Sequence, residues 1–125
     1  MFDPLDFLKL CKEISSYSTI REEALRRTQI GRSYYASHLI AREKVRRYYP
    51  YLLKNLRKRG EEHSVVRDKL KACGHGNISD KLYSLSRYRG TADYDLTQPV
   101  GTSSLTKAIR LSEDIVSLVQ QIRSL

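Results

Sequence analysis

Cysteine is scarce in this sequence, with only Cys11 and Cys73 among 125 residues. They allow at most one disulfide, whereas small secreted domains that depend on disulfides carry larger, even sets. The sequence also lacks a run of about 20 apolar residues, which a membrane-spanning helix requires. Its first residues, 1–4, do not resemble a secretory signal peptide. We therefore expect a cytoplasmic protein with reduced thiols.

Motifs for the common catalytic and metal sites are missing as well. The sequence has no nucleophile elbow, no phosphate-cradling glycine loop and no paired-carboxylate motif. Cys73-Gly74-His75 supplies at most two metal ligands, fewer than the four of a structural zinc site. We expect no metal and no cofactor, so an enzyme with this sequence would have to use arginine, tyrosine and histidine side chains.

Proline is scarce too, and the few that occur mark the ends of expected helices. Asp3 as N-cap and Pro4 at the first helical position predict a helix start. Thr19 and Glu22 have the spacing of a capping box, and no proline follows before Pro50. We expect one helix of about 30 residues there, which Pro50 ends or kinks.

The rest of the chain predicts three shorter helices. One runs from Glu61 to Cys73 with Gly74 as its C-cap. The next follows the loop 74–77 with Asn77 or Ser79 as its N-cap, and the last follows the loop 95–101 with an N-cap within the run 102–104. Together these elements predict one domain over residues 1–125, an all-α up-and-down helical bundle of four to five helices.

Apolar residues recur at helical spacing in the long segment and in the fourth one. The long segment carries the stripe Tyr34, His38, Ala41, Val45, Tyr48 and Leu52, and the fourth carries Ile78, Leu82, Leu85 and Ala92. Gly31 extends the first stripe, where a missing side chain would let another helix approach closely. Arg89 falls in line with the second stripe, so it needs partners if it is buried.

The three histidines lead to different expectations. His38 lies on the apolar stripe, so we expect a core histidine with a hydrogen-bond partner. His63 opens a helix beside two glutamates, so we expect an exposed cap residue. His75 stands in a glycine-rich turn.

Positive charge dominates, with 23 Lys and Arg against 14 Asp and Glu and a net charge of +9. Eight basic residues face the single acid Glu43 between Arg42 and Arg59, with tyrosines interleaved. Such a stretch favours a polyanion partner over a merely solvated helix face, although the tyrosines suit a helix interface equally well. The candidate nucleic-acid contacts in this stretch are Lys44, Arg46, Arg47, Arg57, Lys58 and Arg59.

A second polar segment runs from Arg87 to Asp95. Arg89 and Asp93 are four residues apart and can pair on one helix face. An ion pair that steadies the helix end is one interpretation, although arginine before aspartate is the weaker orientation. A nucleic-acid or nucleotide site that includes Arg87, Arg89 and Asp93 is the other.

Two segments of this sequence resemble the HEPN domain, a family of small helical bundles. Arg32-Ser33-Tyr34-Tyr35-Ala36 is similar to the tyrosine-rich second helix of the family, and Arg89-Gly90-Thr91-Ala92-Asp93-Tyr94-Asp95 is similar to its Arg-x-x-Ala-Asp-Tyr ending. His63-Ser64 lies between them, where many members carry a His-Ser pair. The resemblance implies a homodimer with a polar cleft, and often a metal-independent ribonuclease of a toxin–antitoxin or defence system with a nucleotidyltransferase antitoxin as partner.

The catalytic motif of the family is an arginine followed four to six residues later by a histidine. Arg89 matches the arginine, but Tyr94 stands where the histidine is expected. A tyrosine with its ordinary pKa near 10 is a poor general base at neutral pH. Three functions therefore stay open: a noncatalytic dimer that binds RNA or a nucleotide, an endoribonuclease that uses Arg89 with Tyr94 or a recruited histidine, and a protein-interaction subunit.

Overall fold

The structure is a computed structural model, and it describes residues 2–14, 22–58 and 60–125. These residues contain five helices. They are α1 (Leu5–Glu13), α2 (Glu22–Tyr48), α3 (Glu61–Ala72), α4 (Gly76–Tyr94) and α5 (Thr102–Gln120). Within these ranges there is no strand, so the expected all-α fold is confirmed.

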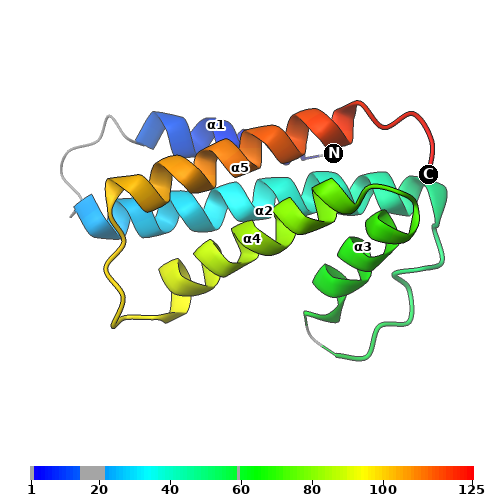
Figure 1. Ribbon diagram of the computed structural model, residues 1–125, viewed down its shortest axis with the longest axis horizontal. Helices are drawn as coiled ribbons and strands as arrows, with labels where there is room; N and C mark the ends of the chain where they lie inside the picture. The colour runs from blue at the N-terminus through cyan, green and yellow to red at the C-terminus, as the bar shows by residue number, and fades with distance from the viewer. Residues whose placement is uncertain (1, 15–21, 59) are drawn as a thin grey trace.

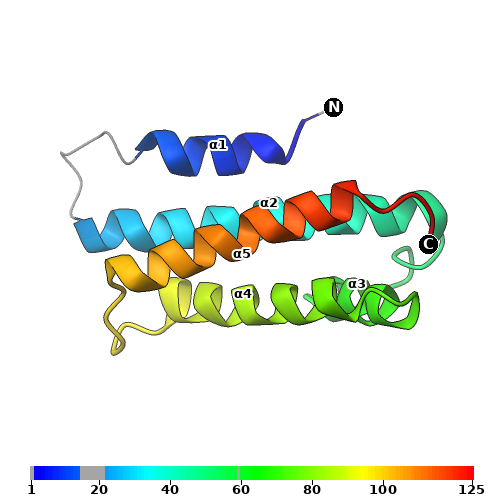
Figure 2. The same cartoon turned by 45° about the horizontal axis from the view of Figure 1, so that its top comes forward.

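Helix α2 is the axis of the bundle and packs against all four other helices. Figure 1 shows α5 and α4 lying along α2, with the shorter α3 beside α4 at one end. In Figure 2, α1 lies on the opposite side of α2 and α5 from α4. Helices α1, α2, α4 and α5 alternate in direction as in an up-and-down bundle, and α3 is a short insertion between α2 and α4.

The residues expected to start and stop helices lie close to helix ends at three places. A side-chain oxygen of Asp3 accepts a hydrogen bond from the backbone N–H of Leu5 at 3.0 Å, although the N-cap position of α1 is Pro4, one residue later than expected. Helix α2 ends at Tyr48, two residues before Pro50. Gly74 follows α3 with φ +88°, a conformation that glycine adopts without strain. The expected capping residue Thr19 lies outside the described residues.

The expected N-caps of α4 and α5 are wrong. Helix α4 begins at Gly76, so Asn77 and Ser79 lie inside its first turn, and the N-cap position is His75. Gly101 occupies the N-cap position of α5, ahead of the run 102–104, and neither helix has a side-chain cap. Cap propensity favours certain residue types at a helix start, but it locates the start only to within a few residues.

The apolar stripe of α2 is buried over most of its length. Tyr34, His38, Ala41 and Val45 are buried, whereas Tyr48 is half-buried and Leu52 lies beyond the helix end. A Cβ atom on Gly31 would lie 2.9 Å from an Asp93 carboxylate oxygen. The space left at Gly31, where we expected another helix to approach, is therefore occupied by a side chain of α4, the Asp93 carboxylate.

Helices α2 and α5 meet through serines that are fully buried. The hydroxyls of Ser37 and Ser112 lie 2.8 Å apart, and the Ser112 hydroxyl donates to the Ser33 carbonyl oxygen at 3.0 Å. Small side chains let the two helices approach closely, and these hydrogen bonds satisfy the hydroxyls that the approach buries.

Arg27 on α2 holds the C-terminal end of α4. Its Nη1 donates to the carbonyl oxygens of Thr91 and Ala92, both at 3.0 Å, and of Asp95 at 3.1 Å, and its Nη2 donates to that of Gln98 at 2.6 Å. The last carbonyls of a helix have no partner within the helix. One guanidinium group thus binds two carbonyl oxygens of the last turn of α4 and two of the segment that follows, and it fixes the part of α4 that carries Arg89.

We expect Arg27→Ala to lower the free energy of unfolding by about 2 kcal/mol, because it removes the donor to the partly buried carbonyl oxygens of Ala92 and Asp95. Urea denaturation measures this loss. Arg47→Ala removes the same charge from an exposed position of α2 and should change stability by less than about 0.5 kcal/mol. Equal effects of the two substitutions would contradict the role of Arg27.

Candidate functional site

Tyrosine, histidine and arginine side chains gather where α2, α3 and α4 meet. Helix α2 contributes adjacent tyrosines and a buried histidine, α3 contributes the residues of its first turn, and α4 contributes its last turns. We call this group the Arg89 cluster, and its members are Tyr34, Tyr35, His38, Glu62, His63, Arg89, Asp93 and Tyr94.

Arg89 is held by three side chains. Its Nε donates to Asp93 Oδ2 at 2.9 Å, and its Nη2 donates to the hydroxyls of Tyr35 at 2.8 Å and Tyr94 at 3.0 Å. The guanidinium carbon also lies 5.6 Å, 5.2 Å and 5.0 Å from the ring centres of Tyr34, Tyr35 and Tyr94. The expected Arg89–Asp93 pair is therefore formed, within a larger aromatic setting that orients the guanidinium.

The absence of a side chain at Gly31 leaves room for Asp93, the carboxylate that pairs with Arg89. Any side chain at that position would meet the Asp93 carboxylate. Because Asp93 in turn binds Arg89 Nε, the glycine on α2 helps to set where the arginine of α4 lies.

His63 is half-buried and stacked, so the expectation of an exposed cap residue is wrong. Its ring lies against the ring of His38 with centroids 3.9 Å apart and planes 16° apart, and its Nδ1 is hydrogen-bonded to the Tyr34 hydroxyl. Packing of α3 onto α2 turns the first turn of α3 inward, which the local pattern of two glutamates and a histidine does not reveal.

His38 is the core histidine with a partner that the sequence predicts. It is 3% exposed, and its Nε2 lies 3.2 Å from Glu62 Oε1. Arg42 Nη1 contacts the same glutamate oxygen at 3.3 Å. One oxygen of Glu62, in the first turn of α3, thus contacts both a histidine and an arginine of α2.

Burial sets the protonation of the cluster. Burial, then the neighbouring His63, lowers the pKa of His38 to about 4, against the opposing effect of Glu62. Burial also lowers the pKa of His63, helped by the positive charges of Arg89, Arg67 and Arg42. Both histidines are therefore neutral at neutral pH.

The other two shifts complete this picture. Burial raises the pKa of Tyr34 to about 12, so its hydroxyl keeps its proton at neutral pH. Burial, the largest single effect on Glu62, raises its pKa, but the hydrogen bond with His38 and the charge of Arg42 outweigh it and the pKa is lowered. Glu62 is therefore an anion beside a neutral histidine.

The three histidines lie at different distances from Arg89. His63 of α3 and Arg89 of α4 both contact Tyr34 of α2. His75 stands at the start of α4, 14 residues before Arg89, which is about 21 Å along a helix. The fold therefore brings His63, and not His75, to the arginine.

The basic stretch from Arg42 to Arg59 lies away from the cluster or is used within the fold. Arg47 is 12 residues beyond Tyr35 on α2, which is about 18 Å. Lys44 Nζ donates to a C-terminal backbone oxygen at 3.1 Å, and Arg46 pairs with Glu43 at 3.3 Å.

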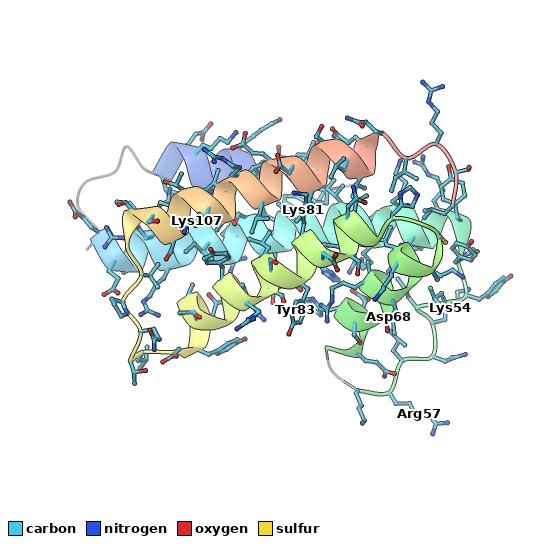
Figure 3. The ribbon with its side chains drawn as sticks, viewed as in Figure 1. Lys54, Arg57, Asp68, Lys81, Tyr83 and Lys107 are labelled. Atoms are coloured by element: carbon cyan, nitrogen blue, oxygen red, sulfur yellow. The ribbon has the colours of Figure 1, made fainter. Side chains whose placement is uncertain are left out.

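The loop after α2 carries the rest of that stretch. The backbone N–H groups of Arg57 and Lys58 donate to Glu61, while the Arg57 side chain extends away from the helices (Figure 3). Arg59 lies outside the described residues. Nearby, the Tyr48 hydroxyl donates to a backbone oxygen at 2.6 Å and the Tyr49 hydroxyl contacts Cys73, so both tyrosines serve internal contacts.

Two predicted site residues face solvent: Tyr94 within the cluster and Arg87 next to it. Tyr94 is 71% exposed although its hydroxyl accepts a hydrogen bond from Arg89. Arg87 is exposed on α4 and lines a hollow of about 400 Å³ with Gly90, Thr91 and Tyr94. The sequence indicated Arg89, Asp93 and Tyr94 as one site.

Other members of the cluster were not predicted as site residues. Tyr34 was expected only as part of the apolar stripe and of the segment that resembles the HEPN domain, and Tyr35 only as part of that segment. Glu62 had no signal of its own. The buried position expected for His38 required a partner, and this was the one hint that a polar residue of another helix lies nearby.

In the described ranges, no three His, Cys, Asp or Glu side chains are grouped so that they could hold a metal ion. No helix among the described residues combines the length and apolar character needed to cross a membrane.

The arrangement defines an all-α bundle with a partly exposed arginine, a neutral histidine and tyrosine hydroxyls at one site. The chain matches no protein-family model and no solved structure. It is similar to an uncharacterized protein of Methanocaldococcus jannaschii, MJ0628, with 28% identity over an alignment of 126 positions that covers 91% of this chain and 76% of that protein. The name of this relative states no function.

We expect the protein to lose stability as the pH falls from about 6.5 towards 4. The pKa of His38 is about 4 in the folded protein and 6.5 ordinarily, so in this range the unfolded chain binds more protons and acid favours unfolding. The groups that face His38 are Glu62, His63, Arg42 and Tyr34. By linkage the loss is on the order of 3 kcal/mol.

Denaturant unfolding at a series of pH values measures this loss. His38→Gln keeps a hydrogen-bond donor for Glu62 but cannot titrate, so it should flatten the stability curve between pH 6.5 and 4. His75→Gln is the matched control at a histidine outside the stack and should leave the slope unchanged. A slope that is the same in all three proteins would show that the stack does not control acid stability.

Proposed function

We propose that this chain is a HEPN-like helical bundle that binds RNA or a nucleotide through the Arg89 cluster, as part of a toxin–antitoxin or defence system. The observation that carries the proposal is the presentation of Arg89. An arginine that only steadied a helix end would pair with Asp93 and need no tyrosines. Here two tyrosine hydroxyls and a carboxylate hold it at the surface of the bundle.

The hydrogen bonds of Arg89 leave donors for a ligand. A guanidinium has five N–H groups. The Nε group binds Asp93, and the two of Nη2 bind Tyr35 and Tyr94. Nη1 donates to no acceptor within the described residues, so its two N–H groups can reach a phosphate oxygen.

The surface around this donor suits a nucleic acid. Tyr94 exposes its ring beside Arg89, and Tyr83 lies 11 residues earlier on α4 with its ring also exposed. Exposed aromatic rings stack bases, and nearby cations bind phosphates. Arg67 of α3 lies over the Tyr83 ring at 5.6 Å and adds a cation at this edge.

We expect wild-type protein to bind a fluorescently labelled single-stranded RNA at low salt, with an affinity that falls steeply as salt rises. Arg89→Ala should weaken binding about tenfold or more, because a phosphate contact and a base platform are lost together. Arg89→Lys keeps the charge but not the fork of donors, so an intermediate loss is expected. Fluorescence anisotropy over a salt series measures all three proteins.

Arg123→Ala removes the same charge from an exposed C-terminal position and should change affinity by less than twofold. Equal affinity of wild type and Arg89→Ala for RNA and for free nucleotides would overturn the proposal. It would leave the third function, an interaction subunit that reads an acidic surface of a protein partner.

Cleavage of RNA is a second candidate, because the fold brings His63 to the arginine. A neutral His63 would take the proton of a ribose 2′-hydroxyl, whose oxygen attacks the adjacent phosphorus. The bond to the 5′-oxygen then breaks, this oxygen takes a proton from Tyr94 or water, and Arg89 stabilises the negative charge on the phosphorus oxygens. The base would be His63 Nε2, which requires that Nδ1–H donates to Tyr34.

We expect any cleavage activity to persist in EDTA and to be lost in Arg89→Ala. His63→Asn should reduce the rate at least about 100-fold, whereas Tyr94→Phe should reduce it by less than tenfold. Gel analysis of a mixed RNA pool measures these rates. A larger loss in Tyr94→Phe than in His63→Asn would assign the essential proton transfer to the tyrosine, and intact RNA with wild type would leave binding as the function.

The same proposal includes the assembly that the HEPN resemblance implies, a homodimer and a nucleotidyltransferase partner. Large apolar side chains stay exposed at the end of α4, with Tyr94 71% and Leu96 86% exposed. A second subunit that covered them would also deepen the site around Arg89.

A further inference from the structure

A groove of about 690 Å³ lies between α4 and α5, apart from the Arg89 cluster. Arg89 bonds to residues of α2 and to its own helix, whereas the groove is formed by the side of α4 that faces α5. Lys81 of α4 and Lys107 of α5, both labelled in Figure 3, border it. The lining residues that matter below are Lys81, Arg87, Tyr88, Lys107, Arg110 and Asp114.

The groove is positively charged and largely uncompensated. Four of its side chains are cations and one is an acid, Asp114, which pairs with Lys81 at 3.6 Å. Arg87, Lys107 and Arg110 form no ion pair with the described carboxylates. By contrast, Glu43 or Glu62 neutralises the arginines Arg42 and Arg46 of α2. The groove therefore concentrates free positive charge.

The floor of the groove is aromatic and apolar. Tyr88 and Leu111 are half-buried and pack against the core, so each shows part of its surface to the groove. Cations around a flat apolar floor suit a ligand that carries both phosphates and bases.

The groove is continuous with the site at Arg89. Arg87 and Thr91 line both the groove and the smaller hollow that contains Gly90 and Tyr94. Nothing lies within 4 Å of where a Gly90 Cβ would be, so the surface is open between them. From Lys81 to Tyr94 the path follows 13 residues of α4, about 20 Å, which is long enough for several nucleotides.

We propose that the α4–α5 groove is an RNA subsite that holds the phosphates of the nucleotides next to the one bound at Arg89. Arg87 joins the two parts, Lys107 and Arg110 bind phosphates from the α5 side, and Tyr88 lies beneath a base. This subsite rests on the proposed RNA-binding function. Its ligand is a single strand that follows α4.

The test compares two labelled single-stranded RNAs, of 4 and 12 nucleotides, by fluorescence anisotropy. The groove variant is the double substitution Lys107→Ala/Arg110→Ala, at two exposed positions of α5. The control is Lys9→Ala/Lys12→Ala, which removes the same charge from exposed positions of α1. Thermal unfolding checks that both variants are folded.

We expect the groove variant to bind the 12-nucleotide RNA about tenfold or more weakly than wild type, and to bind the 4-nucleotide RNA within twofold of wild type. Its plot of log affinity against log salt should be shallower by about 1.4, since two phosphate contacts to a single strand are lost. The control should bind both RNAs within twofold of wild type.

Two results overturn the subsite and are distinguishable from failure of the proposed function. If Arg89→Ala weakens RNA binding but the groove variant binds the long RNA like the control, the groove is not part of the path and the function stands. If the groove variant loses only binding of inorganic pyrophosphate, the groove takes a free phosphate compound instead. If Arg89→Ala binds both RNAs like wild type, the proposed function fails and the subsite fails with it.

Discussion

The need to satisfy polar groups on the buried faces of α2 governs this structure. Helix α2 packs against all four other helices, yet its buried residues include Gln29, Ser33, Ser37 and His38. A buried polar group without a hydrogen bond costs roughly 1–3 kcal/mol. Helices α1, α3 and α5 each present a hydrogen-bond partner to one of these residues. No buried side-chain N or O atom among the described residues lacks a partner.

Each partner orients one helix on α2. Gln29 Nε2 donates to the Cys11 carbonyl oxygen of α1 at 2.6 Å, and Ser112 of α5 meets the buried serines. On α3, Glu62 is hydrogen-bonded to His38 and His63 is hydrogen-bonded to Tyr34. Purely apolar contacts would allow a helix to slide or rotate at little cost, whereas hydrogen bonds between single atoms specify one register.

The candidate site is a consequence of the same constraint. Because α3 must present Glu62 and His63 to α2, a titratable ring comes to lie beside the tyrosines that also hold Arg89. Burial keeps that ring neutral, while Asp93, seated against Gly31, keeps the guanidinium in place. The positive charges divide in a similar way: Arg42 and Arg46 pair with glutamates, whereas the groove between α4 and α5 is lined by Arg87, Lys107 and Arg110, which do not pair with described carboxylates.

The sequence alone determined the all-α class, the long central helix that ends before Pro50, the core histidine with a partner, and the Arg89–Asp93 pair. These depend on interactions within a few residues or on one helical period, which local spacing reveals. Only the tertiary structure decided that His63 turns inward to Arg89 while His75 stays far away. It also decided that the N-cap of α4 is His75 rather than Asn77 or Ser79, and that the N-cap of α5 is Gly101 rather than a residue of the run 102–104. The groove between α4 and α5 was likewise decided there, since its cations are separated by about 20 to 30 residues in the chain. The physical reason is that packing between helices, which sets the rotation of each one about its axis, leaves no local trace in the residue pattern.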